Sequence, residues 1–166
     1  MTTHTTQVDD LQLVAQPSAL PCTELFVRLI LMDWSLLPML AQVTATAGRL
    51  VGAVVDASSA AAPAFITVRL RLQGEMLVIE VDDDLPDLAP PRSTPGERTG
   101  VDRHAPHGRT TWCELPLPGG LTAGQVRLPR REGRRTLVDE PVSGAPVAAD
   151  PAVLERLLTR LSGWSE

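Results

Sequence analysis

A strict two-residue alternation of apolar and polar side chains over residues 65–73 constrains the fold more than any other feature. The apolar set is Ile66, Val68, Leu70 and Leu72, and the polar set is Thr67, Arg69, Arg71 and Gln73. This period is typical of a β-strand with one buried and one wet face. A turn at Gly74 and a second apolar run over residues 76–81 then predict a β-hairpin. Its wet face, which carries Arg69 and Arg71, is expected to meet solvent or a partner.

Two helical segments are predicted before the hairpin. Ser18 is expected to cap the first helix, with Pro21 in its first turn. A stripe at helical spacing then gives the buried face, and it consists of Leu25, Phe26, Leu29 and Ile30. Residues 37–57 form a second helical stretch. Gly48 and Gly52 in its middle each cost about 1 kcal/mol relative to alanine, so we expect something to pack closely there.

The remaining segments complete an α/β fold. Residues 1–9 are expected to be disordered, and residues 11–15 are expected to form a first strand. Residues 85–108 are expected to form a proline-rich irregular loop, and residues 109–115 a last strand. We therefore predict a two-layer sandwich over residues 10–118. Its sheet is mixed but mostly antiparallel and is covered on one face by helices. A Pro/Gly/Arg-rich arm (119–149) and an amphipathic helix (150–162) would follow.

Composition limits the classes of protein that the chain can belong to. Its 166 residues and 43% hydrophobic content are enough for one domain with a full core. A net charge of −5 argues against a general nucleic-acid coat. No apolar run approaches the ~20 residues that cross a bilayer, and the polar start of the chain does not resemble a secretory signal. Two cysteines, Cys22 and Cys113, are expected to be reduced and buried in a cytoplasmic protein.

Several short motifs, in this element order, resemble one known family. The chain looks like the small ATPases similar to anti-sigma factors, within the superfamily of histidine-kinase and Hsp90-type ATP-binding domains. The resemblance covers residues 10–118. The segments that carry it are Ser18–Pro21, Leu25–Arg28, Asp33–Leu36, Arg49–Val55, Ile66–Leu72, Leu77–Pro86 and Gly108–Pro116.

The resemblance implies an ATP site between the helices and the sheet. An Asn on the second helix would hold Mg²⁺, an acidic residue one turn earlier would act as base in kinase members, and a glycine-rich lid would cover the phosphates. In this chain the Asn position holds Ala53 (or Gly52), and the acidic position holds Arg49. The whole sequence contains no Asn, and a proline-rich loop replaces the lid. Asp83 alone matches, as the residue that would contact adenine.

These departures predict a catalytically inactive regulatory module that acts by binding protein. The partner would be a sigma factor or another transcriptional or developmental regulator, and we expect a homodimer. No cofactor is expected, because the side chains that would grip Mg²⁺ and triphosphate are missing. Two alternatives stay open. One is a genuine ATP-binding protein or serine/threonine kinase of the anti-sigma type, and the other is a nucleic-acid-associated factor that uses the segment Arg127–Arg135.

Further candidates for partner binding lie in the last third of the chain. The basic ones are Arg127, Arg130, Arg131, Arg134 and Arg135, and the apolar ones on the predicted final helix are Leu154, Leu157, Leu158 and Leu161. This helix, or the arm before it, is expected to cover the vacated groove in cis or from a second subunit. Asp102, His104 and His107 are interpreted as solvated loop residues rather than metal ligands. Asp82, Asp83 and Asp84 are interpreted as an acidic corner.

Overall fold

The computed structural model describes residues 7–59, 61–62, 64–85 and 88–126. Along the chain the elements are β1 (Val8–Val14), α1 (Ala19–Asp33), the 3-10 turn η1 (Leu37–Met39), α2 (Leu40–Ala57), β2 (Phe65–Gln73), β3 (Met76–Asp83), β4 (Arg98–His104), β5 (Gly108–Pro116) and the 3-10 turn η2 (Pro118–Gly120). The first strand begins at Val8, inside the segment that was expected to be disordered.

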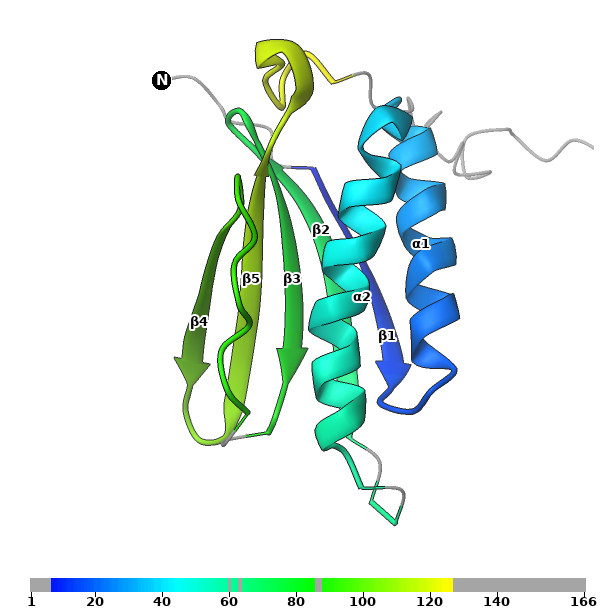
Figure 1. Cartoon of the computed structure of the whole chain (residues 1–166), viewed down its shortest axis with the longest axis vertical. Coiled ribbons are helices and arrows are strands. Elements are labelled where there is room, and N and C mark those ends of the chain that lie inside the picture. The colour runs from blue at the N-terminus through cyan, green and yellow to red at the C-terminus, as the bar shows by residue number, and fades with distance from the viewer. Residues whose placement is uncertain (1–6, 60, 63, 86–87, 127–166) are drawn as a thin grey trace, which may run out of the picture. The chain divides into compact units, whose positions relative to one another are not determined.

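The strands form one five-stranded sheet in the order β1-β2-β3-β5-β4. Both helices lie on the same face of this sheet, and no described helix covers the other face, which we call the open face (Figure 1). The predicted α/β layered fold is confirmed. The expectation of a mixed sheet is not met in the described residues, because all four strand pairings there are antiparallel.

The predicted hairpin is present with the predicted inside and outside faces. Strands β2 and β3 pair around a turn at Gly74, whose φ of +58° suits glycine. The apolar set of β2, from Ile66 to Leu72, is fully buried beneath the helices. Arg69 and Arg71 lie on the open face, as the alternation predicted.

Helix α1 occupies the predicted residues but buries a different face. Its core side is made by Ala19, Thr23, Val27 and Leu31. Leu25 and Leu29, which were predicted to be buried, are 60% and 48% exposed, while Phe26 and Ile30 are half-buried at the edge of the core. The prediction was wrong because α1 is apolar almost all round, so periodicity alone could not select the buried side.

Helix α2 matches the predicted span once the turn η1 is included. An added Cβ at Gly52 would make an ordinary contact of 3.8 Å with Leu20, so α1 does pack against this glycine. The same expectation is wrong for Gly48, around which nothing in the described residues lies within 4 Å of such an atom.

The segment predicted as one long loop contains a strand. Residues 98–104 form β4, which pairs with β5 at the edge of the sheet. Because glycine has a low β-propensity, Gly100 made this strand hard to predict from the sequence. The structure gives a reason for a glycine at this position. A Cβ on Gly100 would come within 2.2 Å of the ring of Trp112, which is the partner of Gly100 on β5. The two cysteines also differ from each other, since Cys113 is buried as predicted but Cys22 is exposed.

Within the described residues, one helical stretch is long and apolar enough to cross a membrane by length and composition. It is Leu37–Ala57, and 39% of it is buried inside the fold. Its buried side chains face the sheet, as in the core helix of a small α/β protein.

Candidate functional site

The resemblance places an adenine-binding aspartate at Asp83, at the end of β3. In the structure this carboxylate is completely buried against Arg109 of β5, whose side chain is 2% exposed. The Arg109 Nη2 and Nε atoms donate to Asp83 Oδ2 over 2.7 and 3.2 Å, and the Leu85 backbone N–H donates to Oδ1. Both carboxylate oxygens therefore accept hydrogen bonds from the chain itself.

The proline-rich segment 88–97 lies against the same face of the sheet as α2 (Figure 1). Two charged side chains, Arg109 and Glu97, hold it there. At one end, Arg109 Nη1 donates to the Leu88 carbonyl oxygen over 2.7 Å. At the other end, the Glu97 carboxylate accepts hydrogen bonds from Thr46 and Arg49 of α2, each over 2.6 Å. We call residues 88–97 the strap.

Glu97 is held as a carboxylate although its side chain is only 3% exposed. Burial by itself raises the pKa of Glu97, but hydrogen bonds from Thr46, Thr94 and Arg49 outweigh burial and bring the pKa to about 2. Arg49, at the position where the resemblance expects an acidic base, thus serves as the cation of this ion pair. It has no role as a proton acceptor, because a guanidinium keeps its proton.

The space left between α2, the strap and the sheet is very small. A cavity of about 10 Å³ is lined by Leu50, Ala53 and Val54 of α2, by Leu88, Ala89 and Pro91 of the strap, and by Arg109 and Thr111 of β5. A volume of this order holds at most one water molecule. In this conformation the protein's own side chains fill the region to which the resemblance assigns a nucleotide.

Cys113 lies beneath the strap on the buried face of β5. Burial raises the pKa of its thiol to about 12, and the negative charge of Glu97 adds to the effect. A thiol with so high a pKa stays protonated at neutral pH and is a poor nucleophile. Cys113 is therefore a core side chain.

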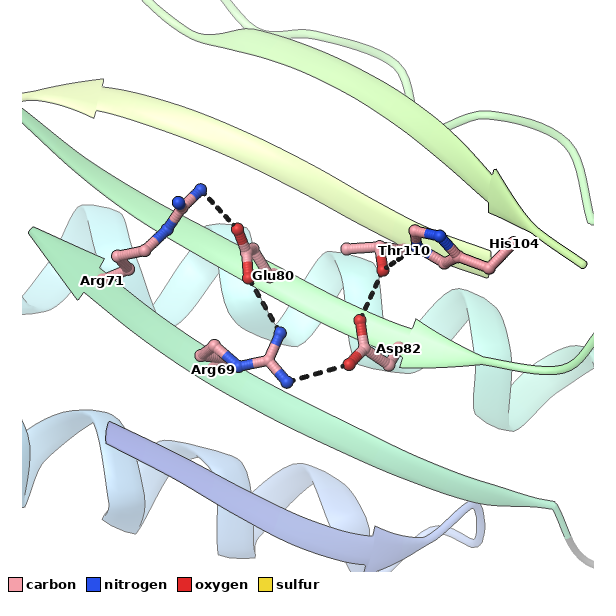
Figure 2. Close-up of polar contacts among 6 residues, drawn as sticks. All are labelled: Arg69, Arg71, Glu80, Asp82, His104 and Thr110. Atoms are coloured by element: carbon pink, nitrogen blue, oxygen red, sulfur yellow. Dashed lines mark hydrogen bonds and ion pairs between the residues drawn. The ribbon is translucent and has the colours of Figure 1, made fainter. Parts of the chain in front are cut away.

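A chain of ion pairs and hydrogen bonds crosses the open face of the sheet from β2 to β4, with the ion pairs between β2 and β3 (Figure 2). Glu80 accepts from Arg71 and Arg69 over 2.6 and 2.9 Å, and Arg69 also donates to Asp82 over 3.0 Å. Hydrogen bonding to Glu80 is the main reason why the pKa of Arg69 is raised above its ordinary value. The predicted partner-binding side chains Arg69 and Arg71 are thus paired within the sheet.

The chain of contacts continues through Thr110 to His104 (Figure 2). Thr110 Oγ1 donates to Asp82 Oδ1 over 2.6 Å and lies 2.9 Å from His104 Nε2. A hydroxyl has one proton, and here that proton points at Asp82, so His104 Nε2 is the donor to Thr110. His104 therefore does not act as a base toward Thr110, and the trio is not an activated nucleophile.

An open depression of about 470 Å³ lies over this end of the sheet. Its lining includes Asp82, predicted to belong to an acidic corner, together with Asp102 and His104, predicted to be solvated loop residues. Asp82 and Asp83 instead point to opposite faces, the first paired on the open face and the second buried. Among the described residues, no group of three His, Cys, Asp or Glu side chains is arranged to hold a metal ion.

The other predicted site residues lie outside the described part of the chain. They are Arg127, Arg130, Arg131, Arg134, Arg135, Leu154, Leu157, Leu158 and Leu161. The arm over residues 119–149 is described as far as Val126, where Ala123 and Val126 are buried in the core.

Sequence reasoning missed the two residues that close the interior, Arg109 and Glu97. A signal for Arg109 was present, because alternation along β5 puts it on the same side as Thr111 and Cys113, and a buried arginine requires an anionic partner. Glu97 gave no comparable signal, since it lies in a loop and reaches a helix 48 residues earlier in the chain.

Comparison with known proteins adds no relative to this picture. No protein-family model matches the chain, and no curated protein is significantly similar to it.

Proposed function

We propose that this protein is a degenerate relative of the anti-sigma-type ATPases and acts in the cytoplasm as a regulatory module that binds protein without nucleotide. Residues 10–118 would form this domain. The proposal rests on the element order, the sequence motifs and the way in which the interior is filled.

The buried pair Asp83–Arg109 carries the argument against nucleotide binding. Adenine would need the Asp83 carboxylate, which is wholly buried and hydrogen-bonded to Arg109 and Leu85. Phosphates and Mg²⁺ would need oxygen ligands on α2 and free donors around them. At that place the chain has Ala53 and an arginine already bound to Glu97.

The regulatory role follows from what remains once catalysis is removed. A rigid α/β scaffold without an accessible interior site can act on other macromolecules through its surface. The resemblance makes a sigma factor the first partner to test. Occlusion of the partner's surface would then replace phosphorylation as the mechanism.

Two measurements on the full-length chain test the proposal. Calorimetry with ATP and Mg²⁺ should show no binding at micromolar nucleotide. Transcription in vitro with each sigma factor of the source organism should reveal at least one whose activity the protein inhibits equally with and without ATP.

The outcomes separate the open alternatives. Micromolar ATP binding that is lost in Asp83→Ala would overturn the proposal in favour of a genuine ATP-binding protein or kinase, and transfer of radiolabelled phosphate would identify the kinase. Strongly salt-dependent binding to DNA or RNA, with no effect on any sigma factor, would favour the nucleic-acid alternative.

A further inference from the structure

The strap is held against α2 and β5 in the way that a bound peptide would be held. It contains no helix or strand, and polar contacts fix its two ends. At its start, the Leu88 carbonyl oxygen accepts a hydrogen bond from Arg109 Nη1 over 2.7 Å. At its end, the Glu97 carboxylate accepts hydrogen bonds from Thr46 and Arg49, each over 2.6 Å. We call the space that the strap fills between α2 and β5 the channel.

Few apolar groups of the strap are buried between these two ends. Leu88 and Pro91 are half-buried, and with Ala89 they line the small cavity against α2. The residues from Arg92 to Gly96 are all exposed. A segment with so few buried apolar side chains opens locally at a smaller cost in free energy than the strands and helices around it. Opening of the strap is therefore compatible with a folded core.

The strap uses only part of the guanidinium of Arg49. The Nη2 atom donates to Glu97, but the Nε atom is buried without a hydrogen-bond partner in the described part of the chain. Arginine binds a carboxylate most strongly through two parallel N–H groups. A carboxylate that approaches Arg49 from the side can use both Nε and Nη2. Arg49 therefore has binding capacity that Glu97 leaves unused.

We propose that the strap is an internal ligand, and that the channel binds an extended acidic segment of a partner protein once the strap has left it. This inference rests on the proposed function as a protein-binding module, and it adds the chemistry that the partner presents. The strap is then an autoinhibitory element, because it occupies the binding site of the partner.

The contacts of the strap define the chemistry of the partner's segment. An apolar side chain packs against Leu50, Ala53 and Val54, which line the channel on α2. A backbone carbonyl oxygen accepts from Arg109 at one end, and a Glu or Asp carboxylate pairs with Arg49 at the other. When the strap leaves, Arg49 loses the one anion that it contacts among the described residues. The arriving segment must supply another, so a neutral or basic segment is disfavoured.

The strap and the partner's segment exclude each other. With the strap in place, only about 10 Å³ remains between it, α2 and β5, which is no more than the space of one water molecule. A second chain therefore cannot enter beside the strap. Because the strap is tethered, its effective concentration at the channel is of the order of millimolar. Weakening the contacts of the strap should raise the affinity for a peptide added in trans.

A peptide with the sequence of the strap, residues 88–97 (Leu-Ala-Pro-Pro-Arg-Ser-Thr-Pro-Gly-Glu), tests the inference by fluorescence anisotropy. It carries an uncharged fluorophore and an amidated end, so its glutamate is its one carboxylate. The full-length variant Glu97→Ala should bind it about 10-fold more tightly than wild type, because its own strap has lost a charged hydrogen-bond acceptor. The same peptide with glutamine in place of glutamate should bind Glu97→Ala about 10-fold more weakly.

Two further variants locate the binding, and one serves as a control. Leu88→Ala loosens the other end of the strap and leaves Arg49 intact, so it should also bind the peptide more tightly than wild type does. Arg49→Gln/Glu97→Ala lacks the guanidinium and should lose the gain seen in Glu97→Ala. Glu24→Ala removes the same charge from an exposed position of α1 and should bind as weakly as wild type. Circular dichroism identifies any variant that does not fold, and Leu88→Ala keeps the test open if Glu97→Ala fails.

Three results would overturn the inference. The first is equal affinity of wild type, Glu97→Ala and Leu88→Ala for the peptide, including no binding by any of them at about 1 mM protein, the order of the tethered strap's own concentration. The second is tight binding that persists in Arg49→Gln/Glu97→Ala. The third is equal binding of the glutamate and glutamine peptides. Calorimetry with ATP and transcription in vitro do not involve this peptide, so the proposed function and this inference can fail separately.

Discussion

Arg109 enters the core from β5 with 2% of its side chain exposed, so its charge must be matched inside the fold. Asp83 supplies that match across the strand pairing, and the two residues are direct partners in the register of β3 and β5. The same contact occupies the Asp83 carboxylate, whose two oxygens accept hydrogen bonds from Arg109 and from the Leu85 backbone.

Removing one partner of this pair should be strongly destabilising. Asp83→Ala leaves a buried guanidinium without an anion, and we expect it to lower the free energy of unfolding by about 3–5 kcal/mol. Urea denaturation measures the change. The double variant Asp83→Leu/Arg109→Met removes both charges and should lose less than the single variant. A loss below about 1 kcal/mol in Asp83→Ala would show that the pair is not closed to water.

Glu97 makes stability depend on pH in acid. Its folded pKa of about 2 lies below the ordinary 4.5, so the ionised form stabilises the fold above pH 4.5 and this contribution is lost as the pH falls toward 2. We expect Glu97→Gln to be less stable than wild type by about 1–2 kcal/mol at pH 6, since Arg49 is one-third exposed and solvent screens the pair. The difference between the two proteins should vanish near pH 2. A difference that is constant with pH would contradict the ion pair.

At the level of elements, the hairpin could be predicted because period-two alternation fixes both the strand and its buried side. The buried face of α1 could not be predicted, because α1 carries apolar residues on most of its sides. Which of these sides is buried depends on how α1 packs against α2. β4 was hidden for a different reason. Its Arg98, Asp102 and His104 are polar, and its Gly100 lies against the ring of Trp112, a residue of another strand. The Asp83–Arg109 contact likewise depends on a strand register between residues 26 positions apart.

The contact between β4 and Trp112 can be tested at Gly100. Gly100→Ala would put a methyl group 2.2 Å from the Trp112 ring, so the ring must move, and we expect a loss of about 1–3 kcal/mol in the free energy of unfolding. The shift in tryptophan fluorescence reports the displaced ring. Gly124→Ala is the matched control, because an added Cβ there meets nothing described within 4 Å. Equal stability of both variants would mean that Trp112 does not need the space above Gly100.

At the level of the whole domain, the two faces differ in chemistry. On the open face of the sheet, the anions Glu80 and Asp82 are paired with Arg69 and Arg71 of the same face (Figure 2). A partner that bound there would have to replace contacts that are already made. On the helical layer, by contrast, α1 exposes the apolar side chains of Leu25, Leu29 and Met32, which are 60%, 48% and 53% exposed. Burying these three side chains would gain the free energy of apolar burial without breaking an ion pair of the sheet.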